Sequence, residues 1–178
     1  MVTPSLFRRL LGPAIDAMAP ALRAVHDSDA DQILSGFATI EASRDPVARL
    51  LCRVMRLPAP GSDVPVTVRF ARRGGIEHWH RTFGDRHYNS TLHARRGLLV
   101  ERMGPATNVF HISVVAGALH LDLIGFRFLG IPLPRHMRPA CNAVERDRDG
   151  AFTFDIPVGL PGLGRVIHYC GRLETIHD

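Results

Sequence analysis

Lysine is absent from this chain, because all 22 basic residues are arginine, set against 17 Asp and Glu for a formal net charge of +5. Without a lysine, the sequence excludes Schiff-base chemistry, a lysine general base and the lysine of a P-loop. The arginines adjoin one another only at Arg8-Arg9, Arg72-Arg73 and Arg95-Arg96. Nucleic-acid binding favours a basic stripe with interleaved aromatic residues. No such stripe exists, so we predict no nucleic-acid partner.

Long apolar runs and cysteine pairs are also missing. No run approaches the roughly 18 apolar residues that cross a bilayer. The N-terminal segment MVTPSLFRRLLGPAIDAMAP is too polar, and too interrupted by proline, for a secretion signal. Cys52, Cys141 and Cys170 are odd in number and lack C-x-x-C spacing, which favours buried free thiols over a disulfide framework or a zinc site. We expect a cytoplasmic protein with no membrane partner.

The composition is that of an ordinary globular protein, with 46% hydrophobic and 22% charged residues. A chain of 178 residues fits one domain with a real core, and no linker, low-complexity tract or internal repeat divides it. We therefore predict a single domain over 1–178. Residues 1–61 are predicted to be mainly helical with one strand, and residues 62–178 to form an antiparallel β-meander.

The first third carries helical spacing. Segment 13–26 follows the break at Gly12-Pro13, and residues 26–29 close it as a polar loop. A strand is predicted over 32–41. The residues at helical spacing in the first two segments are Leu6, Leu10, Leu11, Ile15, Met18, Leu22 and Val25.

Asp45-Pro46 then predicts a helix start, with a capping carboxylate before a proline at the first helical position. The helix is expected over 47–57, and Pro58 begins the segment that ends it. Its apolar residues on one side are Val47, Leu50, Leu51, Val54 and Leu57.

From residue 64 the hydrophobic pattern changes to period two, broken at regular intervals by turn residues. The predicted strands are 64–71, 76–83, 86–93, 98–103, 107–115, 118–129, two that flank 147–150, and 164–176. Short strands at such spacing indicate an antiparallel meander that curls on itself. We predict an α+β fold in which the N-terminal helices pack on about 8–10 strands forming a barrel or half-barrel, lipocalin-like or helix-grip-like. The helices are expected to plug one end or lie in the concave face.

One hairpin, HWHRTFGDRHYNS over 78–90, concentrates histidines and aromatic residues around a Gly84-Asp85 turn. Alternation separates its side chains into two faces. The apolar face is predicted to point inward, because aromatic side chains gain most from burial. That face carries Trp79, Arg81, Phe83, Tyr88, Ser90 and Leu92. The opposite face carries His78, His80, Thr82, His87, Asn89, Thr91 and His93.

The spacing His78-x-His80 places two imidazoles on one strand face, as some metal sites require, and His87 or His93 can supply a third. No acidic ligand is near, and the face is expected to be solvated. We predict no metal, with a metal on this histidine face as the alternative.

Arg81 is predicted to point inward between Trp79 and Phe83. A buried guanidinium keeps its charge and must find partners. Glu101 on a neighbouring strand is the first candidate, with Glu145 and Asp155 as others. Arg81 is then either half of a structural ion pair or an anchor for a ligand inside the barrel.

The chain resembles a bacterial family of unknown function whose members are sometimes fused behind saccharopine-dehydrogenase-like, NAD-binding domains. The resemblance rests on LFRRLLGPAIDAMAPALRAVH near the start, Trp79-x-Arg81-x-Phe83, Ser90, GFRFLGIPLP and His168-Tyr169-Cys170-Gly171-Arg172-Leu173. It covers nearly the whole chain and implies no catalytic residues. It implies instead that an oxidoreductase-like protein is a possible partner. The chain itself has no G-x-G-x-x-G motif.

The function that these features favour is a barrel that binds a hydrophobic small molecule with a polar or anionic end, anchored by Arg81 and without a cofactor. Its predicted binding residues are Trp79, Arg81, Tyr88, Ser90, Glu101 and Tyr169. The aromatic residues available to line the cavity are Trp79, Tyr88, Phe110, Phe126, Phe128, Phe152, Phe154 and Tyr169, of which strand alternation is expected to send some to the outer layer.

Two alternatives stay open. The first is a proton-transfer enzyme, such as an isomerase, cyclase or dehydratase, in the same cavity. Its candidate acids and bases are His111, His120, Asp122, His168 and Tyr169, with Arg81 stabilising an oxyanion. The second is an accessory module that docks on a separate oxidoreductase.

Overall fold

Ten antiparallel strands close into a barrel in the computed structural model of the chain, which describes residues 4–55 and 57–176. The ten strands are β1 (Gln32–Ala42), β2 (Gly61–Arg73), β3 (Ile76–Phe83), β4 (Arg86–Arg95), β5 (Leu98–Met103), β6 (Ala106–Val115), β7 (Ala118–Phe128), β9 (Ala140–Arg148), β10 (Ala151–Leu160) and β11 (Gly164–Thr175). A two-residue strand, β8 (Ile131–Pro132), extends the sheet beside β7.

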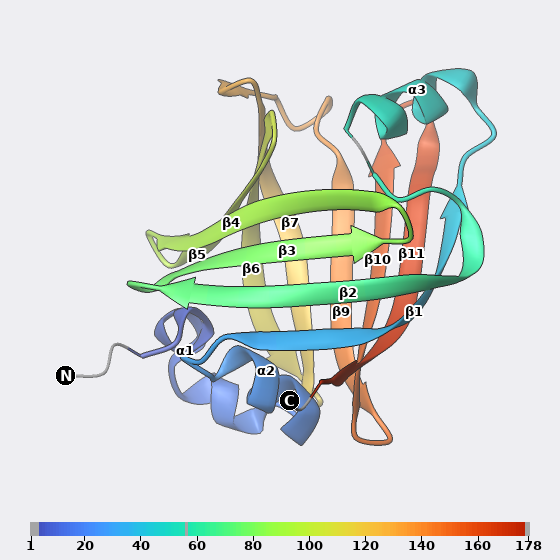
Figure 1. Cartoon of the computed structure of the whole chain (residues 1–178). Helices are drawn as coiled ribbons and strands as arrows, with labels where there is room; N and C mark the ends of the chain where they lie inside the picture. Colours follow the sequence, from blue (N-terminus) through green and yellow to red (C-terminus); the bar gives the residue numbers. More distant parts are fainter. Residues whose placement is uncertain (1–3, 56, 177–178) are drawn as a thin grey trace.

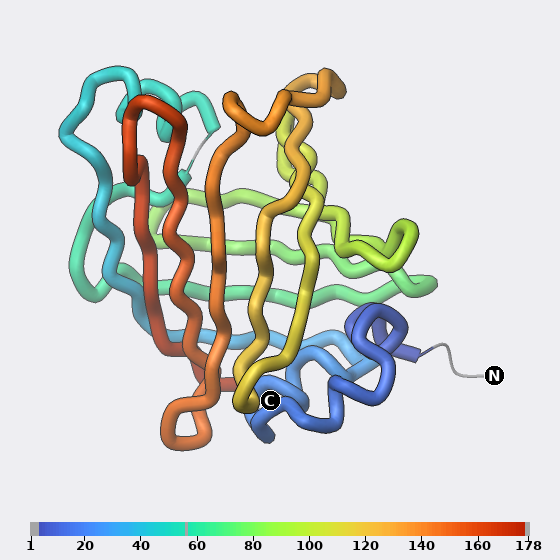
Figure 2. Tube along the Cα trace, turned by 180° about the vertical axis from the view of Figure 1, so that it is seen from behind, coloured from blue at the N-terminus to red at the C-terminus, as the bar shows by residue number. Residues whose placement is uncertain are grey.

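The strands follow one another around the barrel in chain order. β7 pairs with β9 after the short β8, and β1 closes the circle by pairing with both β2 and β11. Strands β1 to β4 cross one side of the barrel, and β6, β7 and β9 to β11 run steeply along the other (Figures 1 and 2). The predicted α+β fold with an antiparallel barrel is confirmed.

One end of the barrel is closed by the N-terminal helices, and we call it the closed end (Figure 1). These are α1 (Leu6–Leu11), the 3-10 helix η1 (Gly12–Ala17) and α2 (Pro20–His26). The segment 13–26, predicted from its helical spacing, is divided between η1 and α2, because Pro20 starts a new helix at a position where its missing N–H costs nothing. The predicted polar loop at His26 is wrong, since His26 ends α2 and is fully buried.

The helix α3 (Pro46–Val54) lies at the opposite end of the barrel (Figure 1). Its predicted cap is confirmed, because Asp45 Oδ1 accepts hydrogen bonds from the backbone N–H groups of Val47 at 2.8 Å and Ala48 at 3.0 Å. The helix was predicted to reach Leu57 but ends at Val54, and Arg56 lies outside the described residues.

The side of α3 that packs on the barrel is formed by Ala48 and Cys52, which are buried. The apolar side predicted from the sequence is divided. Val47, Leu50 and Val54 face outward and are 54%, 59% and 60% exposed, whereas Leu51 is 38% exposed and Leu57 packs against the core. Small side chains let the helix backbone approach the barrel closely, and the large ones are left outside. Among the described residues, no helix is long and apolar enough to cross a membrane.

The hairpin of β3 and β4 has the predicted register, in which Phe83 faces Arg86 and Arg81 faces Tyr88 across the ladder. Gly84 has φ +57°, as the first central residue of a type II′ turn requires. Trp79 and Tyr88 are buried. The two-residue turn therefore fixes which side chains enter the barrel.

Two glycines allow the sheet to bend where β1 meets β11. A Cβ on Gly36 would lie 2.0 Å from the carbonyl oxygen of Arg172. A Cβ on Gly171 would lie 2.6 Å from the carbonyl oxygen of Phe37 and 2.6 Å from Cζ of Phe154. These positions tolerate no side chain, because backbone and ring atoms already fill the space.

Gly171→Ala is expected to lower the free energy of unfolding by about 2–3 kcal/mol, because the added methyl group overpacks the bend. Gly97→Ala is the matched control: Gly97 has φ +75° and a Cβ added there would meet nothing within 4 Å, so the variant carries only the backbone cost of about 1 kcal/mol. Chemical denaturation of both variants measures the difference. Equal losses would contradict a close approach at Gly171.

Candidate functional site

The barrel encloses a cavity of about 400 Å³. This volume lies within the usual range for small-molecule sites. The cavity reaches α3 through Leu51 and the segment after β8 through Met137, and these lining residues are 38% and 54% exposed. The cavity therefore opens at the end opposite the closed end. We call this opening, bounded by α3 and residues 129–139, the mouth.

All eight aromatic residues proposed from the sequence line the cavity: Trp79, Tyr88, Phe110, Phe126, Phe128, Phe152, Phe154 and Tyr169. The expectation that alternation sends some of them outward is wrong, and a β-bulge in β7 is the reason. Leu123 pairs with Phe110 while Gly125 pairs with Val109, so Ile124 is the extra residue. The bulge shifts the alternation by one residue, which turns Phe126 and Phe128 inward with Leu121 and Leu123.

The charged and amide side chains in the lining are four, among mostly apolar residues: Arg81, Glu101, Asn108 and Glu145. Arg81 is 14% exposed and donates to Glu101 Oε1 at 3.0 Å and to Ser90 Oγ at 2.7 Å. The other carboxylate oxygen of Glu101 accepts from Asn108 at 3.2 Å. The guanidinium charge is therefore compensated inside the barrel.

Two aromatic rings also contact the guanidinium group of Arg81. The Cζ atom of Arg81 lies 4.7 Å from the ring centroid of Trp79 and 5.4 Å from that of Tyr88. Burial lowers the pKa of Arg81, but the Glu101 carboxylate and the neighbouring hydroxyl groups outweigh this effect and raise it overall. Arg81 is a fixed cation in a mainly apolar cavity.

The predicted binding residues are brought together, with one difference. Trp79, Arg81, Tyr88, Glu101 and Tyr169 line the cavity. Ser90 is buried outside that lining and supports Arg81 by accepting its hydrogen bond.

Of the three candidate partners for Arg81, Glu101 is the one that binds it. Glu145 pairs with His26 at the closed end, and Asp155 pairs with His168, which is on the next strand, at 2.8 Å. The order of the strands decides this outcome. Arg81 on β3 and Glu101 on β5 lie on the two strands that flank β4, and they share the inner face, so the two side chains meet across β4.

The two tyrosines of the chain, Tyr88 and Tyr169, both face the cavity. The Tyr88 hydroxyl is buried and makes no hydrogen bond of normal geometry to a described residue. The neighbouring Tyr169 hydroxyl interacts with it and lowers its pKa, an effect that burial outweighs. Burial raises the pKa of Tyr88 and raises that of Tyr169 well above the usual value of a phenol. Both side chains are therefore neutral hydroxyl groups that can donate or accept a hydrogen bond.

Cys141 adds a neutral thiol to the same cavity. Burial, reinforced by the nearby Glu101 carboxylate, raises its pKa to about 12. The thiolate is the reactive form of cysteine, and at neutral pH almost none is present. Cys141 is thus a small, unreactive part of the lining.

The acid–base candidates are mostly outside this cavity. Tyr169 lines it, whereas His111 is exposed, and the Asp122 carboxylate is held by Asn142 on the outer surface. His120 lies between two inward residues of β7 and so points outward. His168 binds Asp155. The cavity thus gathers hydrogen-bonding groups but not the acid–base set proposed from the sequence.

The outward face of the β3–β4 hairpin carries the four histidines, three of which bond to their cross-strand neighbours. His80 bonds Asn89 at 3.1 Å, and His87 bonds Thr82 at 2.9 Å. His78 bonds Thr91 at 3.2 Å. Within the described ranges, no three His, Cys, Asp or Glu side chains are grouped closely enough to hold a metal ion.

A buried hydrogen bond at the closed end was not predicted from the sequence. His26 Nε2 lies 2.6 Å from Glu145 Oε2, and the His26 ring packs 4.2 Å from that of Phe7 between centroids. No local sequence pattern indicates this contact, because the two residues are 119 positions apart in the chain. Glu145 is also part of the cavity lining, so this pair forms the floor of the cavity.

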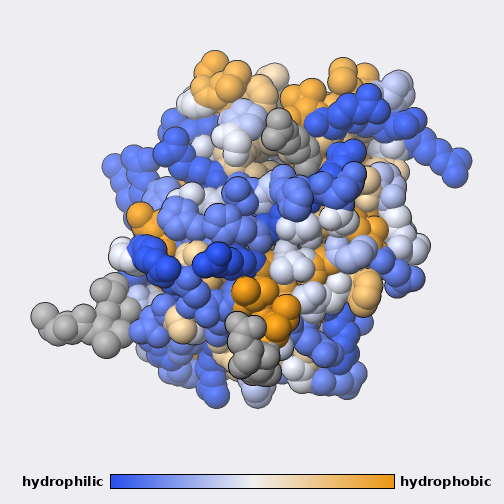
Figure 3. All heavy atoms as spheres, in the orientation of Figure 1, coloured by the Kyte–Doolittle hydropathy of each residue, from blue (hydrophilic) through white to orange (hydrophobic). Residues whose placement is uncertain are grey.

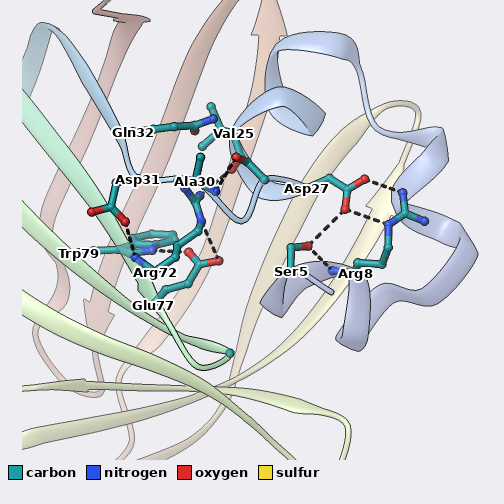
Figure 4. A network of polar contacts seen from close by, with 12 residues as sticks. Ser5, Arg8, Val25, Asp27, Ala30, Asp31, Gln32, Arg72, Glu77 and Trp79 are labelled. Carbon is teal, nitrogen blue, oxygen red and sulfur yellow. Dashed lines mark hydrogen bonds and ion pairs between the residues drawn. The ribbon is translucent and has the colours of Figure 1, made fainter. Parts of the chain in front are cut away.

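Arg72 forms a second buried polar group nearby (Figure 4). Its guanidinium donates to the carbonyl oxygens of Val25 at 2.6 Å and Ala30 at 2.5 Å. Glu77 Oε1 lies 3.4 Å from Arg72 Nε, in ion-pair range but without hydrogen-bond geometry. Glu77 Oε2 accepts from the Trp79 indole at 2.8 Å, which fixes the ring that stacks on Arg81.

The sequence of residues 18–173 matches the family model described as a domain of unknown function, DUF4166. The chain belongs to this family. The match covers the strands that enclose the cavity and, at the closed end, α2 but not α1 or η1. Among curated proteins, none matches this chain significantly.

A solved structure has a similar fold: the crystal structure of Rv2717c from M. tuberculosis, with a TM-score of 0.51 and 17% sequence identity. The similarity covers 90% of this chain and 99% of that chain. At this identity the likeness concerns the barrel fold alone.

Tyrosine ionisation is expected to coincide with alkaline unfolding. The folded pKa of both tyrosines is raised, so their contribution to stability is complete below the unfolded pKa of 10.0 and is lost as pH rises above it. Tyrosinate absorbance and circular dichroism, recorded together against pH, measure this. Because the chain has two tyrosines, the absorbance reports on the cavity alone. Ionisation near pH 10 in protein that is still folded would contradict the burial of these hydroxyls.

Proposed function

We propose that this barrel binds a hydrophobic small molecule whose polar end lies at Arg81, Tyr88 and Tyr169. The observation that carries the proposal is the buried Tyr88 hydroxyl, which lies beside the Tyr169 hydroxyl, makes no hydrogen bond of normal geometry to a described residue, and faces an apolar cavity that is open at the mouth. A buried hydroxyl without a partner costs stability. A ligand with one hydrogen-bonding end would satisfy it.

The charges around the anchor favour an uncharged polar end, such as a carbonyl or hydroxyl group. Glu101 already compensates Arg81 at 3.0 Å, so a carboxylate placed there would face a second negative charge in a low-dielectric interior. Tyr88 and Tyr169 are neutral and can donate to a carbonyl oxygen. The alternative is a ligand with an anionic end, and the experiments below distinguish it from a ligand with an uncharged polar end.

The rest of the ligand would lie against the aromatic and aliphatic wall. Trp79 belongs to this wall and is the single tryptophan of the chain, so its fluorescence reports on the cavity without labelling. Trp79 also stacks on Arg81, which places the reporter beside the polar anchor.

Tyr88→Phe is expected to weaken binding of dodecan-2-one about two- to tenfold, the value of one hydrogen bond, while leaving stability unchanged or higher. The stability effect follows because the hydroxyl makes no hydrogen bond of normal geometry to a described residue that the substitution would remove. Titration followed by Trp79 fluorescence measures affinity, and chemical denaturation measures stability. An unchanged affinity with a ligand that does bind would remove Tyr88 from the site.

A matched set of ligands tests the anchor itself. Dodecan-2-one, dodecanol, dodecanoate and dodecane share one chain length and differ at the end group. We expect the ketone and the alcohol to bind more tightly than dodecanoate, and dodecane to bind least well. Tighter binding of dodecanoate would favour the anionic end, and equal binding of all four would contradict a polar anchor.

The contribution of Arg81 requires a paired substitution. Arg81→Met alone would leave the Glu101 carboxylate buried without its partner, which lowers stability by about 3–5 kcal/mol. A loss of ligand binding in that variant would then not distinguish loss of the anchor from unfolding. Arg81→Met combined with Glu101→Gln removes both charges. This double variant should fold and lose the preference for polar end groups, and a retained preference would assign the anchor to the tyrosines alone.

A further inference from the structure

The mouth is bordered by exposed apolar side chains on two sides. On α3, Val47, Leu50 and Val54 recur at helical spacing along one outer stripe, and all three are more than half exposed. A helix packed on a globular protein ordinarily has charged or polar residues on its outer side. The outer stripe of α3 departs from this pattern at the edge of the cavity.

The second side is the segment after β7. Leu129 is 71% exposed, Ile131 65% and Met137 54%, and Phe128 and Met137 also line the cavity. Figure 3 shows apolar side chains gathered at two places along the upper edge of the molecule, over α3 and over the turn that follows β7. The two apolar edges therefore stand on either side of the mouth.

Arginines accompany both apolar edges. Residues 46–54 contain Arg49 and Arg53, and residues 129–139 contain Arg135 and Arg138. Neither segment contains a carboxylate side chain. Arg49, Arg53 and Arg135 are exposed, and Arg138 donates to the carbonyl oxygen of Ile124. The rim of the mouth thus combines exposed large apolar residues with several arginines, next to a single capping carboxylate, Asp45, at the start of α3.

We propose that the mouth docks on the surface of a bilayer containing anionic phospholipids. Large apolar side chains beside arginines match the boundary between acyl chains and negatively charged headgroups. The absence of a membrane partner was expected because no segment spans a bilayer, but docking at the surface needs no such segment.

A protein partner fits the same rim less well. The two apolar edges are separated by the opening of the cavity, so a protein would have to bridge them and cover the mouth. A fluid lipid surface receives both edges and leaves the cavity facing the membrane. The docking surface therefore gives the proposed hydrophobic ligand a route between the bilayer and the barrel, and this use of the surface rests on the proposed function.

The test is sedimentation of the full chain with sucrose-loaded vesicles of phosphatidylcholine, with or without phosphatidylglycerol. We expect binding to the vesicles that contain phosphatidylglycerol, reduced by added salt because screening weakens the arginine contribution. The combined variant Leu129→Ser and Ile131→Ser should reduce the partition coefficient about tenfold or more, because two exposed apolar side chains are lost.

Val115→Ser is the matched control, because Val115 is 55% exposed at the end of β6, where the strand meets the closed end. It should bind vesicles as the unmodified chain does. All the substituted side chains are exposed, and unchanged thermal unfolding checks that each variant folds. Arg49→Gln with Arg53→Gln should weaken binding only to the vesicles that contain phosphatidylglycerol.

Three results would overturn the docking proposal: no sedimentation with either vesicle, equal loss in the Val115→Ser control, or concentration-dependent dimers that Leu129→Ser and Ile131→Ser abolish. The last would assign the rim to contact between two copies of the chain. Ligand titration by Trp79 fluorescence needs no vesicles, so failure of docking and failure of the cavity to bind a ligand are separate outcomes.

Discussion

The ion pair between Arg81 and Glu101 is the constraint around which the interior is arranged. Two charges inside a barrel are costly unless each is matched and hydrogen-bonded. Here Ser90 and Asn108 complete the pair at 2.7 Å and 3.2 Å, and Trp79 stacks on the guanidinium. A purely structural pair could be replaced by well-packed apolar residues without loss of stability. Its position in the lining of a cavity, rather than in a packed core, is what favours a functional interpretation.

The two ends of the barrel differ in whether their apolar side chains are buried or exposed to solvent. At the closed end, helices bury Phe7 and His26, and the floor is sealed by the pair between His26 and Glu145. At the mouth, α3 packs on the barrel through Ala48 and Cys52 and leaves its larger apolar residues outside. Val47, Leu50 and Val54 are each more than half exposed there. The exposed stripe therefore lowers solubility and contributes nothing to the core. An exposed apolar surface of this kind indicates a site of contact with another molecule or a membrane.

The sequence predicted what local periodicity controls. The register of the β3–β4 hairpin and the inward side of Trp79 and Arg81 followed from a two-residue turn and alternation, both set by neighbouring residues. The outward side of α3 and the burial of His26 were missed because each depends on partners far away in the chain. The expectation that some of the eight candidate aromatic residues face outward failed for a related reason: a bulge of one residue at Ile124 reverses the alternation in β7 and leaves little trace in the sequence pattern. The lack of a normal hydrogen bond to the Tyr88 hydroxyl could not be predicted, because no sequence pattern indicates a missing contact.

The depth of the polar anchor bears on the direction of ligand entry. Arg81 stacks on Trp79, and Trp79 contacts Phe7 of the closed end with ring centroids 6.3 Å apart. The apolar residues Leu133 and Met137 line the cavity near the mouth. A ligand bound as proposed would thus place its polar end deep and its apolar end outward. An amphiphile in a bilayer presents its polar end toward the aqueous side, where a docked barrel would meet it first. The polar end of the ligand would therefore enter the barrel first and reach the deep anchor, and the apolar chain would follow it and lie near the mouth.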